Sequence, residues 1–298
     1  MSSTSGADPG LFGPASVTWQ VHGDPMMWIA GVRALYLQAL HPRAVRGIMI
    51  NSTFMDDAWG RLMRTAGFVG TTTYGTTEAA ERAGERVRGI HRRLGVDDPE
   101  LLLWVHCAEI DSYLGVARRS GLRMTDAQAD RYVDEHRQSA RLVGLDPRQV
   151  PACAEELAEY FAAMRPALEA GDDARAVHAF LRRPPVHPAL VPARELVWRH
   201  VAGLALASLP PWALDLYGAP APRAADRRLR ATGAVLRGIP ARLRWQLPPG
   251  HILKAVARLG PGSRPAPYKL DRMAAILGGP GRAQRSDGGD STRWRTPG

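Results

Sequence analysis

The stretch Trp104-Val105-His106-Cys107-Ala108-Glu109-Ile110-Asp111-Ser112 is the segment around which the rest of the chain can be arranged. It lies in a well-marked helix, because Asp98 is a favourable N-cap, Pro99 suits the first helical position and Gly121 is a typical left-handed stop. At 3.6 residues per turn, His106 shares a face with four apolar residues, Leu102, Leu103, Ile110 and Tyr113.

An imidazole in the middle of an apolar stripe has two explanations. The commoner one is a core histidine whose ring nitrogens are hydrogen-bonded within the protein. The other is a ligand for a metal or a haem iron in an apolar pocket. Asp111 falls on a neighbouring stripe with Trp104 and Cys107, so a carboxylate also points toward buried or half-buried surroundings. This segment alone favours the core histidine.

Composition limits the class of protein. With 298 residues and 45% hydrophobic content, the chain can bury a full core as one large domain or two small ones. Two cysteines make no disulfide framework and no export signal precedes them, so we expect a cytoplasmic protein. The longest apolar run, 201–209, is far shorter than the roughly 20 residues that span a membrane.

The positive charge is concentrated at one end of the chain. Residues 219–298 hold 16 of the 39 Lys and Arg but only four of the 29 Asp and Glu, while the chain as a whole carries +10. The preceding body is therefore nearly neutral. This distribution argues against a basic groove built into the fold and against a specific nucleic-acid partner.

The pattern of the remaining chain predicts helices with recognisable capping residues. Helices are expected over 26–50 with a break at His41-Pro42, 77–94, 125–143, 151–169, 174–181 and 192–208, with weaker ones at 231–236 and 251–259. Thr71–Gly75 is the one β-like stretch, which we interpret as an extended linker. His91 and His136 lie on charged helices and are expected to be solvated.

The pattern predicts an all-α protein with a single main domain. We divide it into a flexible N-terminus (1–18), a helical domain (19–218), a basic helical extension (219–277) and a disordered basic tail (278–298). Nothing in the sequence indicates an oligomeric state.

Polar residues occur in four clusters on apolar helices. Burying such groups is costly unless they meet a shared anionic partner, and a haem would supply one through its iron and propionates. Phosphate-binding loops, zinc motifs and nucleophile elbows are absent. The clusters are Arg33 with Gln38 and His41, Arg61 with Arg64 and Thr65, His106 with Asp111, and Trp198 with Arg199 and His200.

Several motifs, in order and spacing, resemble the catalytic domain shared by the MpaB oxygenases and the latex-clearing protein (rubber oxygenase). The resemblance covers roughly residues 19–218. The motifs are Gly31-Val32-Arg33-Ala34-Leu35-Tyr36-Leu37-Gln38-Ala39-Leu40-His41-Pro42, Gly60-Arg61-Leu62-Met63-Arg64-Thr65, the stretch 104–112, Arg131-Tyr132 with Glu135, and Leu209-Pro210 with Tyr217-Gly218.

The resemblance implies a globin-like helical core that holds haem b and oxidises hydrophobic substrates with dioxygen. His106 matches the proximal iron ligand, and Arg61 and Thr65 match residues on the distal side of the haem. Arg64 stands where the rubber oxygenase has a lysine, and a guanidinium is a poor iron ligand. The glutamate base of that enzyme has no counterpart, because Val45 and Asn51 occupy the expected region.

The expected function is therefore a haem-b-dependent oxidoreductase acting on a small hydrophobic substrate and dioxygen. Candidate contacts to the cofactor are His106, Arg33, His41, Asp111 and His200, with Arg61, Arg64 and Thr65 as catalytic candidates. For His41, a capping role within its own turn stays the alternative. Two other functions stay open: a non-catalytic haem or hydrophobic-ligand carrier or sensor, and a haem-free helical protein whose basic tail contacts nucleic acid or anionic lipid.

Overall fold

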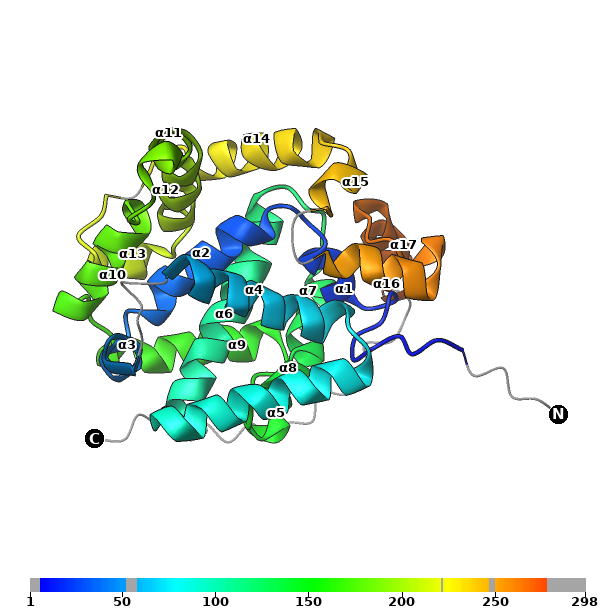
Figure 1. The fold of residues 1–298 in the computed structure, drawn as a ribbon, viewed down its shortest axis with the longest axis horizontal. Helices are drawn as coiled ribbons and strands as arrows, with labels where there is room; N and C mark the ends of the chain where they lie inside the picture. Colours follow the sequence, from blue (N-terminus) through cyan, green and yellow to red (C-terminus); the bar gives the residue numbers. More distant parts are fainter. Residues whose placement is uncertain (1–5, 52–57, 221, 247–249, 278–298) are drawn as a thin grey trace.

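The computed structural model describes residues 6–51, 58–220, 222–246 and 250–277, and these contain helices and connecting turns but no strand (Figure 1). The prediction of an all-α fold is confirmed for this part of the chain. The tail 278–298, which we expected to be disordered, lies outside the described residues. The α-helices are α1 (Val17–His22), α2 (Met27–Gln38), α3 (Pro42–Asn51), α4 (Ala58–Tyr74), α5 (Thr77–Leu94), α6 (Pro99–Arg119), α7 (Asp126–Glu135), α8 (Arg137–Val143), α9 (Ala154–Met164), α10 (Asp172–Arg182), α11 (Val191–Ala193), α12 (Arg199–Ala207), α13 (Pro211–Leu216), α14 (Ala225–Gly238), α15 (Ala241–Arg244), α16 (His251–Leu259) and α17 (Pro267–Leu277).

The centre of the molecule is the packing of α2 against α6. The side chain of Asp98 accepts a hydrogen bond from the Glu100 N–H at the start of α6, and Gly121 has the expected left-handed backbone after its end. Buried polar side chains join the two helices: the Trp104 indole N–H donates to the Gln38 carbonyl at 3.0 Å, and the Gln38 amide donates to the Val105 carbonyl at 3.1 Å. Each helix thereby fixes the position of the other.

The clearest difference between the predicted and the observed secondary structure lies at 71–75. This segment is not an extended linker, because α4 continues to Tyr74. Threonines tolerate a helix when their hydroxyls find partners, and here the Thr72 hydroxyl donates to the Val69 carbonyl at 3.0 Å while Thr73 Oγ1 lies 2.8 Å from His22 Nδ1. Tertiary contacts thus outweigh the β propensity of the threonine run.

Most predicted caps are present. α5 spans the predicted residues and ends at the left-handed Gly95, and Thr125 with Gln128 forms a full capping box before α7. The predicted helix over 125–143 is divided at His136 into α7 and α8. The predicted helix over 192–208 is likewise interrupted, by a π-helical turn at Arg194–Trp198 before α12.

Both ends of the described chain pack against the body. Val17 and Thr18, which we assigned to the flexible N-terminus, lie in α1, are fully buried and donate backbone hydrogen bonds to the Glu135 carboxylate. In the basic extension, α14 runs along the upper edge of Figure 1 and α16 lies beside α4. A Cβ atom at Gly70 of α4 would stand only 2.2 Å from the His251 ring, so this contact requires glycine.

Arg237 connects the extension to the body. Its guanidinium binds the Asp24 carboxylate, at 2.6 Å from Nε, and donates to the Ser120 carbonyl and hydroxyl, each at 2.8 Å. The Asp24 side chain is only 3% exposed and that of Arg237 18%. Loss of the guanidinium would leave a buried carboxylate without its cation, which is far more costly than losing an exposed ion pair.

We therefore expect Arg237→Met to lower the free energy of unfolding by about 3 kcal/mol in urea titrations. Arg228→Met removes an exposed arginine from the same helix and is the matched control, with an expected change below about 0.5 kcal/mol. Equal losses in the two variants would contradict the anchoring role of Arg237.

Candidate functional site

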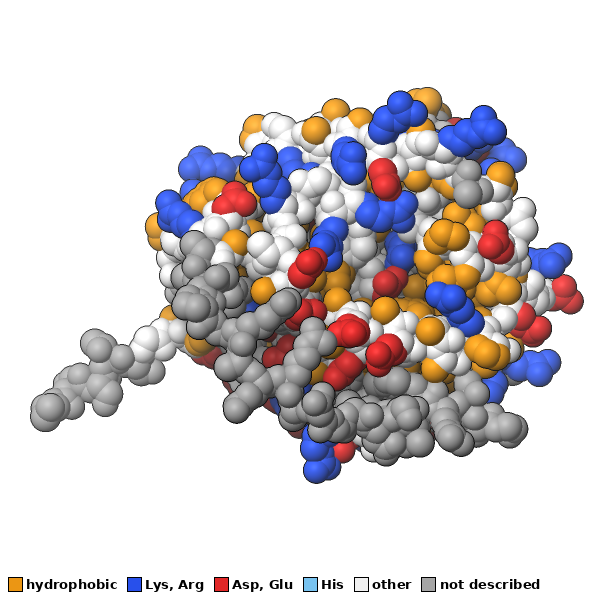
Figure 2. All heavy atoms as spheres, turned by 180° about the vertical axis from the view of Figure 1, so that it is seen from behind, with side chains coloured by type: hydrophobic (Ala, Val, Ile, Leu, Met, Phe, Trp, Pro, Cys, Tyr) orange, Lys and Arg blue, Asp and Glu red, His pale blue; other side chains and the backbone are white. Residues whose placement is uncertain are grey.

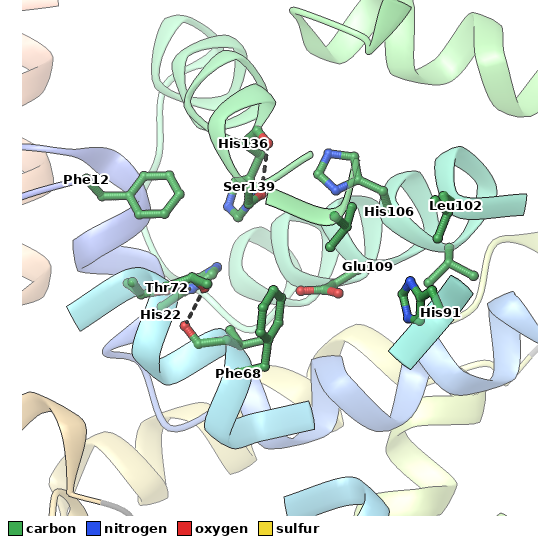
Figure 3. A pocket seen from close by; sticks show the side chains of 14 residues that line it. Phe12, His22, Phe68, Thr72, His91, Leu102, His106, Glu109, His136 and Ser139 are labelled. Atoms are coloured by element: carbon green, nitrogen blue, oxygen red, sulfur yellow. Dashed lines mark hydrogen bonds between the residues drawn. The ribbon is translucent and has the colours of Figure 1, made fainter. Parts of the chain in front are cut away.

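Two neighbouring cavities are each lined by residues of both α4 and α6. The smaller has a volume of about 70 Å³ and is lined by the aromatic rings Phe12 and Phe68 among others (Figure 3). The larger has a volume of about 1280 Å³. Because His22, Val69, Thr73 and Glu109 line both, single side chains separate the two spaces.

His106 of α6 lines the smaller cavity. The side chain is 8% exposed, and its Nε2 is buried without a hydrogen-bond partner among the described residues. Burial lowers the pKa of the ring to about 4, because the charged imidazolium would lose its hydration. The ring is therefore neutral near pH 7 and keeps a lone pair for a ligand.

His22 and His136 bring two further imidazoles to the same cavity. The ring centroid of His136 lies 5.2 Å from that of His22 and 6.5 Å from that of His106. His22 is held at both nitrogens, by Thr73 at 2.8 Å and by the Tyr132 hydroxyl at 3.0 Å. Burial lowers the pKa of His22 to about 3 and that of His136 well below its ordinary value. The cluster is thus uncharged at neutral pH.

Glu109 lies one turn after His106 on α6. In Figure 3 its carboxyl group extends into the space between His106 and Phe68. Burial raises its pKa to about 7, because a carboxylate is poorly solvated there. Glu109 therefore exchanges a proton near physiological pH, as a group that transfers protons must.

The larger cavity is mostly apolar and reaches the surface. Its inner wall comes from small and aliphatic residues of α2 and α4, including Gly31, Ala34, Leu62 and Ala66. Its outer wall includes exposed residues of α11, α12 and α15 and of the connections beside them. A deep, apolar space with few polar groups is the usual form of a site for a hydrophobic small molecule.

The structure places Arg33 and Asp111 together, away from both cavity linings. Arg33 Nη1 lies 2.8 Å from Asp111 Oδ2, and the guanidinium also donates to the Ser112 hydroxyl at 2.7 Å and to the Ser208 carbonyl at 3.0 Å. The arginine is 5% exposed, so its burial is compensated within the protein. Because Asp111 supplies the negative charge, the burial of Arg33 does not by itself require an external anion.

His41 also lies outside both cavity linings. It is 7% exposed, packs near Trp104, and its Nδ1 accepts a hydrogen bond from the Ala44 N–H at 3.4 Å. The ring therefore caps the start of α3. His200 does line the larger cavity, but it is exposed, and its Nε2 lies 3.1 Å from the Thr232 hydroxyl.

The Arg61 cluster is only partly described. Thr65 lies on α4 and lines the larger cavity. Arg64 is exposed, and the side chain of Arg61 lies outside the described residues. The structure thus brings Thr65 of this cluster to the large cavity and His106 to the smaller one, with Val69 of α4 contributing to both linings.

Four residues of the smaller cavity were not predicted from the sequence as site residues: His22, His91, Glu109 and His136. His136, which we expected to be solvated, is 4% exposed, and His91 contributes to the cavity wall. The signal for His136 was present, because Ala129, Tyr132 and Val133 precede it at helical spacing on a buried face. Glu109 could have been found by its position one turn from His106, whereas the place of His22 depends on tertiary contacts.

Fold and site define an all-α protein with uncharged buried histidines beside a large apolar cavity. Residues 19–238 match the family described as ER-bound oxygenase mpaB/B'/Rubber oxygenase, catalytic domain, and the chain belongs to this family. The resemblance found in the motifs is thereby confirmed, and the match includes α14, beyond the predicted limit at residue 218. Comparisons with curated proteins and with solved structures give no match.

Membership of an oxygenase family supports an enzyme that uses dioxygen and an oxidisable substrate. In the described part of the chain, every helix is too short or too polar to cross a bilayer.

The raised pKa of Glu109 gives a test of the site's electrostatics. Between its ordinary value of 4.5 and about 7, the folded protein binds this proton more tightly than the unfolded chain, so the buried carboxylate destabilises the fold above pH 7 and not below pH 4.5. We expect Glu109→Gln to stabilise the protein at pH 8, relative to its effect at pH 4.5, by up to about 3 kcal/mol in urea unfolding. A difference from wild type that is the same at both pH values would contradict the raised pKa.

Proposed function

We propose that this protein is a haem-b-dependent oxygenase that acts on a small hydrophobic substrate with dioxygen. The observation that carries the proposal is the buried Nε2 of His106, which has no partner among the described residues at a cavity bordered by α4 and α6. A buried nitrogen without a hydrogen bond costs about 1–3 kcal/mol, which a bound group at this place would recover.

The residues present fit a haem. A neutral imidazole is the nitrogen donor that haem iron binds, and the lowered pKa keeps His106 in that form. The cavity beside the His106 ring, with a volume of about 70 Å³, is too small for a tetrapyrrole. The adjoining cavity of about 1280 Å³ is large enough. The two cavities are separated only by side chains that line both of them. The apolar lining suits the faces of a porphyrin.

The proposal assigns roles to residues of this chain. His106 would hold the iron, and a bound haem would supply dioxygen binding and activation. Thr65 would offer a hydroxyl to the oxygen side, together with Arg61, as the resemblance implies. Glu109 can hold or release a proton at its carboxyl oxygens near neutral pH. The walls of the larger cavity would exclude water and bind the hydrophobic substrate.

Arg33 and Asp111 would act as positioning residues. Their ion pair, extended to Ser112 and Ser208, fixes α6 against α2 and the end of α12. His41, which caps α3, belongs to the same support. His200 would border the substrate space near its opening rather than the iron.

The haem proposal is tested by absorption spectroscopy of protein produced with ample haem. Wild type should show a Soret band, and His106→Ala should lose most of it, with partial recovery when free imidazole is added to fill the space left by the ring. His200→Ala, a histidine at the exposed end of the larger cavity, should keep the band. A colourless wild type, or a Soret band unchanged in a folded His106→Ala protein, would refute the assignment.

A bulky side chain at the opening of the larger cavity tests whether the substrate binds in that cavity. Ala193→Trp places a large ring on an exposed residue that lines the larger cavity, whereas Ala189→Trp places it on an exposed residue outside the lining. With both variants retaining the Soret band, we expect kcat/KM for oxygen uptake with a hydrophobic alkene to fall about tenfold or more in the first only. Haem binding without oxygen uptake in wild type would favour the carrier or sensor function instead.

A further inference from the structure

Exposed apolar side chains gather around the opening of the larger cavity. Leu196 is 79% exposed, Val197 63% and Leu243 58%, although all three also line the cavity. Soluble monomers rarely expose a contiguous apolar patch without a binding partner. We define the mouth rim as the six large hydrophobic residues of the described chain that are both exposed and part of this lining: Trp28, Leu190, Leu196, Val197, Ile239 and Leu243.

The mouth rim is built mostly from connections between helices. Leu196 and Val197 lie on the π-helical turn between α11 and α12, while Ile239 and Leu243 lie at the passage from α14 to α15. These elements occupy the upper edge of Figure 1, on the opposite side of the molecule from α5. The rim residues therefore share one side of the molecule, at the connections that border the larger cavity.

The chain around the rim is strongly basic. Residues 182–246 contain 11 Arg and three acidic residues, which accounts for most of the net charge of the chain. Of the acidic residues, Glu195 forms salt bridges with Arg183, Arg194 and Arg199, and Asp226 forms one with Arg119. Arg182, Arg228 and Arg242 are exposed. Figure 2 shows Lys and Arg side chains interspersed with hydrophobic ones along the same upper edge.

We propose that the mouth rim docks on the surface of an anionic phospholipid bilayer, from which a lipophilic substrate enters the larger cavity. The leucines and valine would enter the boundary of the acyl chains, and the surrounding arginines would bind lipid phosphates. A nucleic acid would use the arginines but leave the apolar rim in water, so the combination favours a lipid surface. This binding is peripheral, and it goes beyond the proposed oxygenase function because it does not require haem.

Vesicle sedimentation of the full-length protein tests the docking. We expect vesicles with roughly a third phosphatidylglycerol to bind the protein at least about tenfold more strongly than pure phosphatidylcholine vesicles, with the difference shrinking in high salt. Leu196→Asp should reduce binding to the anionic vesicles at least about fivefold, because a charge at the acyl boundary is costly. Arg242→Gln should reduce it by about fivefold, which is the contribution of one basic residue near an anionic surface.

Leu94→Asp is the matched control, since Leu94 is 40% exposed at the end of α5 and lies outside the cavity lining. It should bind anionic vesicles like wild type, and circular dichroism should show that all variants are folded. Absence of wild-type binding, or equal effects of Leu94→Asp and Leu196→Asp, would overturn the proposal. A dimer in wild type that Leu196→Asp dissociates, without vesicle binding, would assign the rim to a second copy of the chain. The Soret band recorded on the same samples separates failure of docking from failure of haem binding.

Discussion

The pairing of α2 with α6 is the constraint on which the rest of the structure depends. Arg33, Gln38 and Trp104 carry polar groups of these two helices into the core, and each of the three is compensated by the other helix or by the turn at Ser208. An internal ion pair of this kind adds little net stability over an apolar pair, but removing either partner is costly. The arrangement therefore selects one register of α6 against α2. That register directs His106 and Glu109 toward α4.

The space toward α4 explains the electrostatics of the site. His22, His106, His136 and Glu109 share one cause for their shifted pKa values, which is the loss of hydration in a small aromatic-lined cavity. The shifts have opposite signs for acids and bases but the same result, because each group is driven toward its neutral form. The cavity thus brings several hydrogen-bonding side chains together without net charge. The proposed haem would meet a neutral nitrogen donor here, with the volume that it needs supplied by the adjoining larger cavity.

The sequence was sufficient for the parts of the fold that local chemistry decides. Helix limits set by caps, as at Gly95, Asp98, Thr125 and Gly144, agree with the structure because a side-chain cap or a left-handed glycine acts on its own turn. The stretch 71–75 was misjudged because its threonine hydroxyls are satisfied by tertiary contacts with His22 and by the helix itself. Arg33 and Asp111 were each recognised as buried polar residues, but their mutual pairing required the α2–α6 register. The oxygen-side role of Arg61 and Thr65 stays a prediction.

The partnerless imidazole nitrogens of the smaller cavity are the strongest argument that this cavity serves a ligand. His22 has partners at both ring nitrogens, whereas His136 has Ser139 at Nδ1 but, like His106, no partner among the described residues at its buried Nε2. His106 is buried on the central helix α6 and has no hydrogen bond at its buried Nε2 from the described residues. A leucine at this position would avoid that cost, so stability alone gives no reason for an imidazole. A group that binds the folded protein at this nitrogen would convert the cost into affinity, because anything that binds the native state preferentially also stabilises it. On this argument the protein gains a net benefit from His106 only in its ligand-bound state.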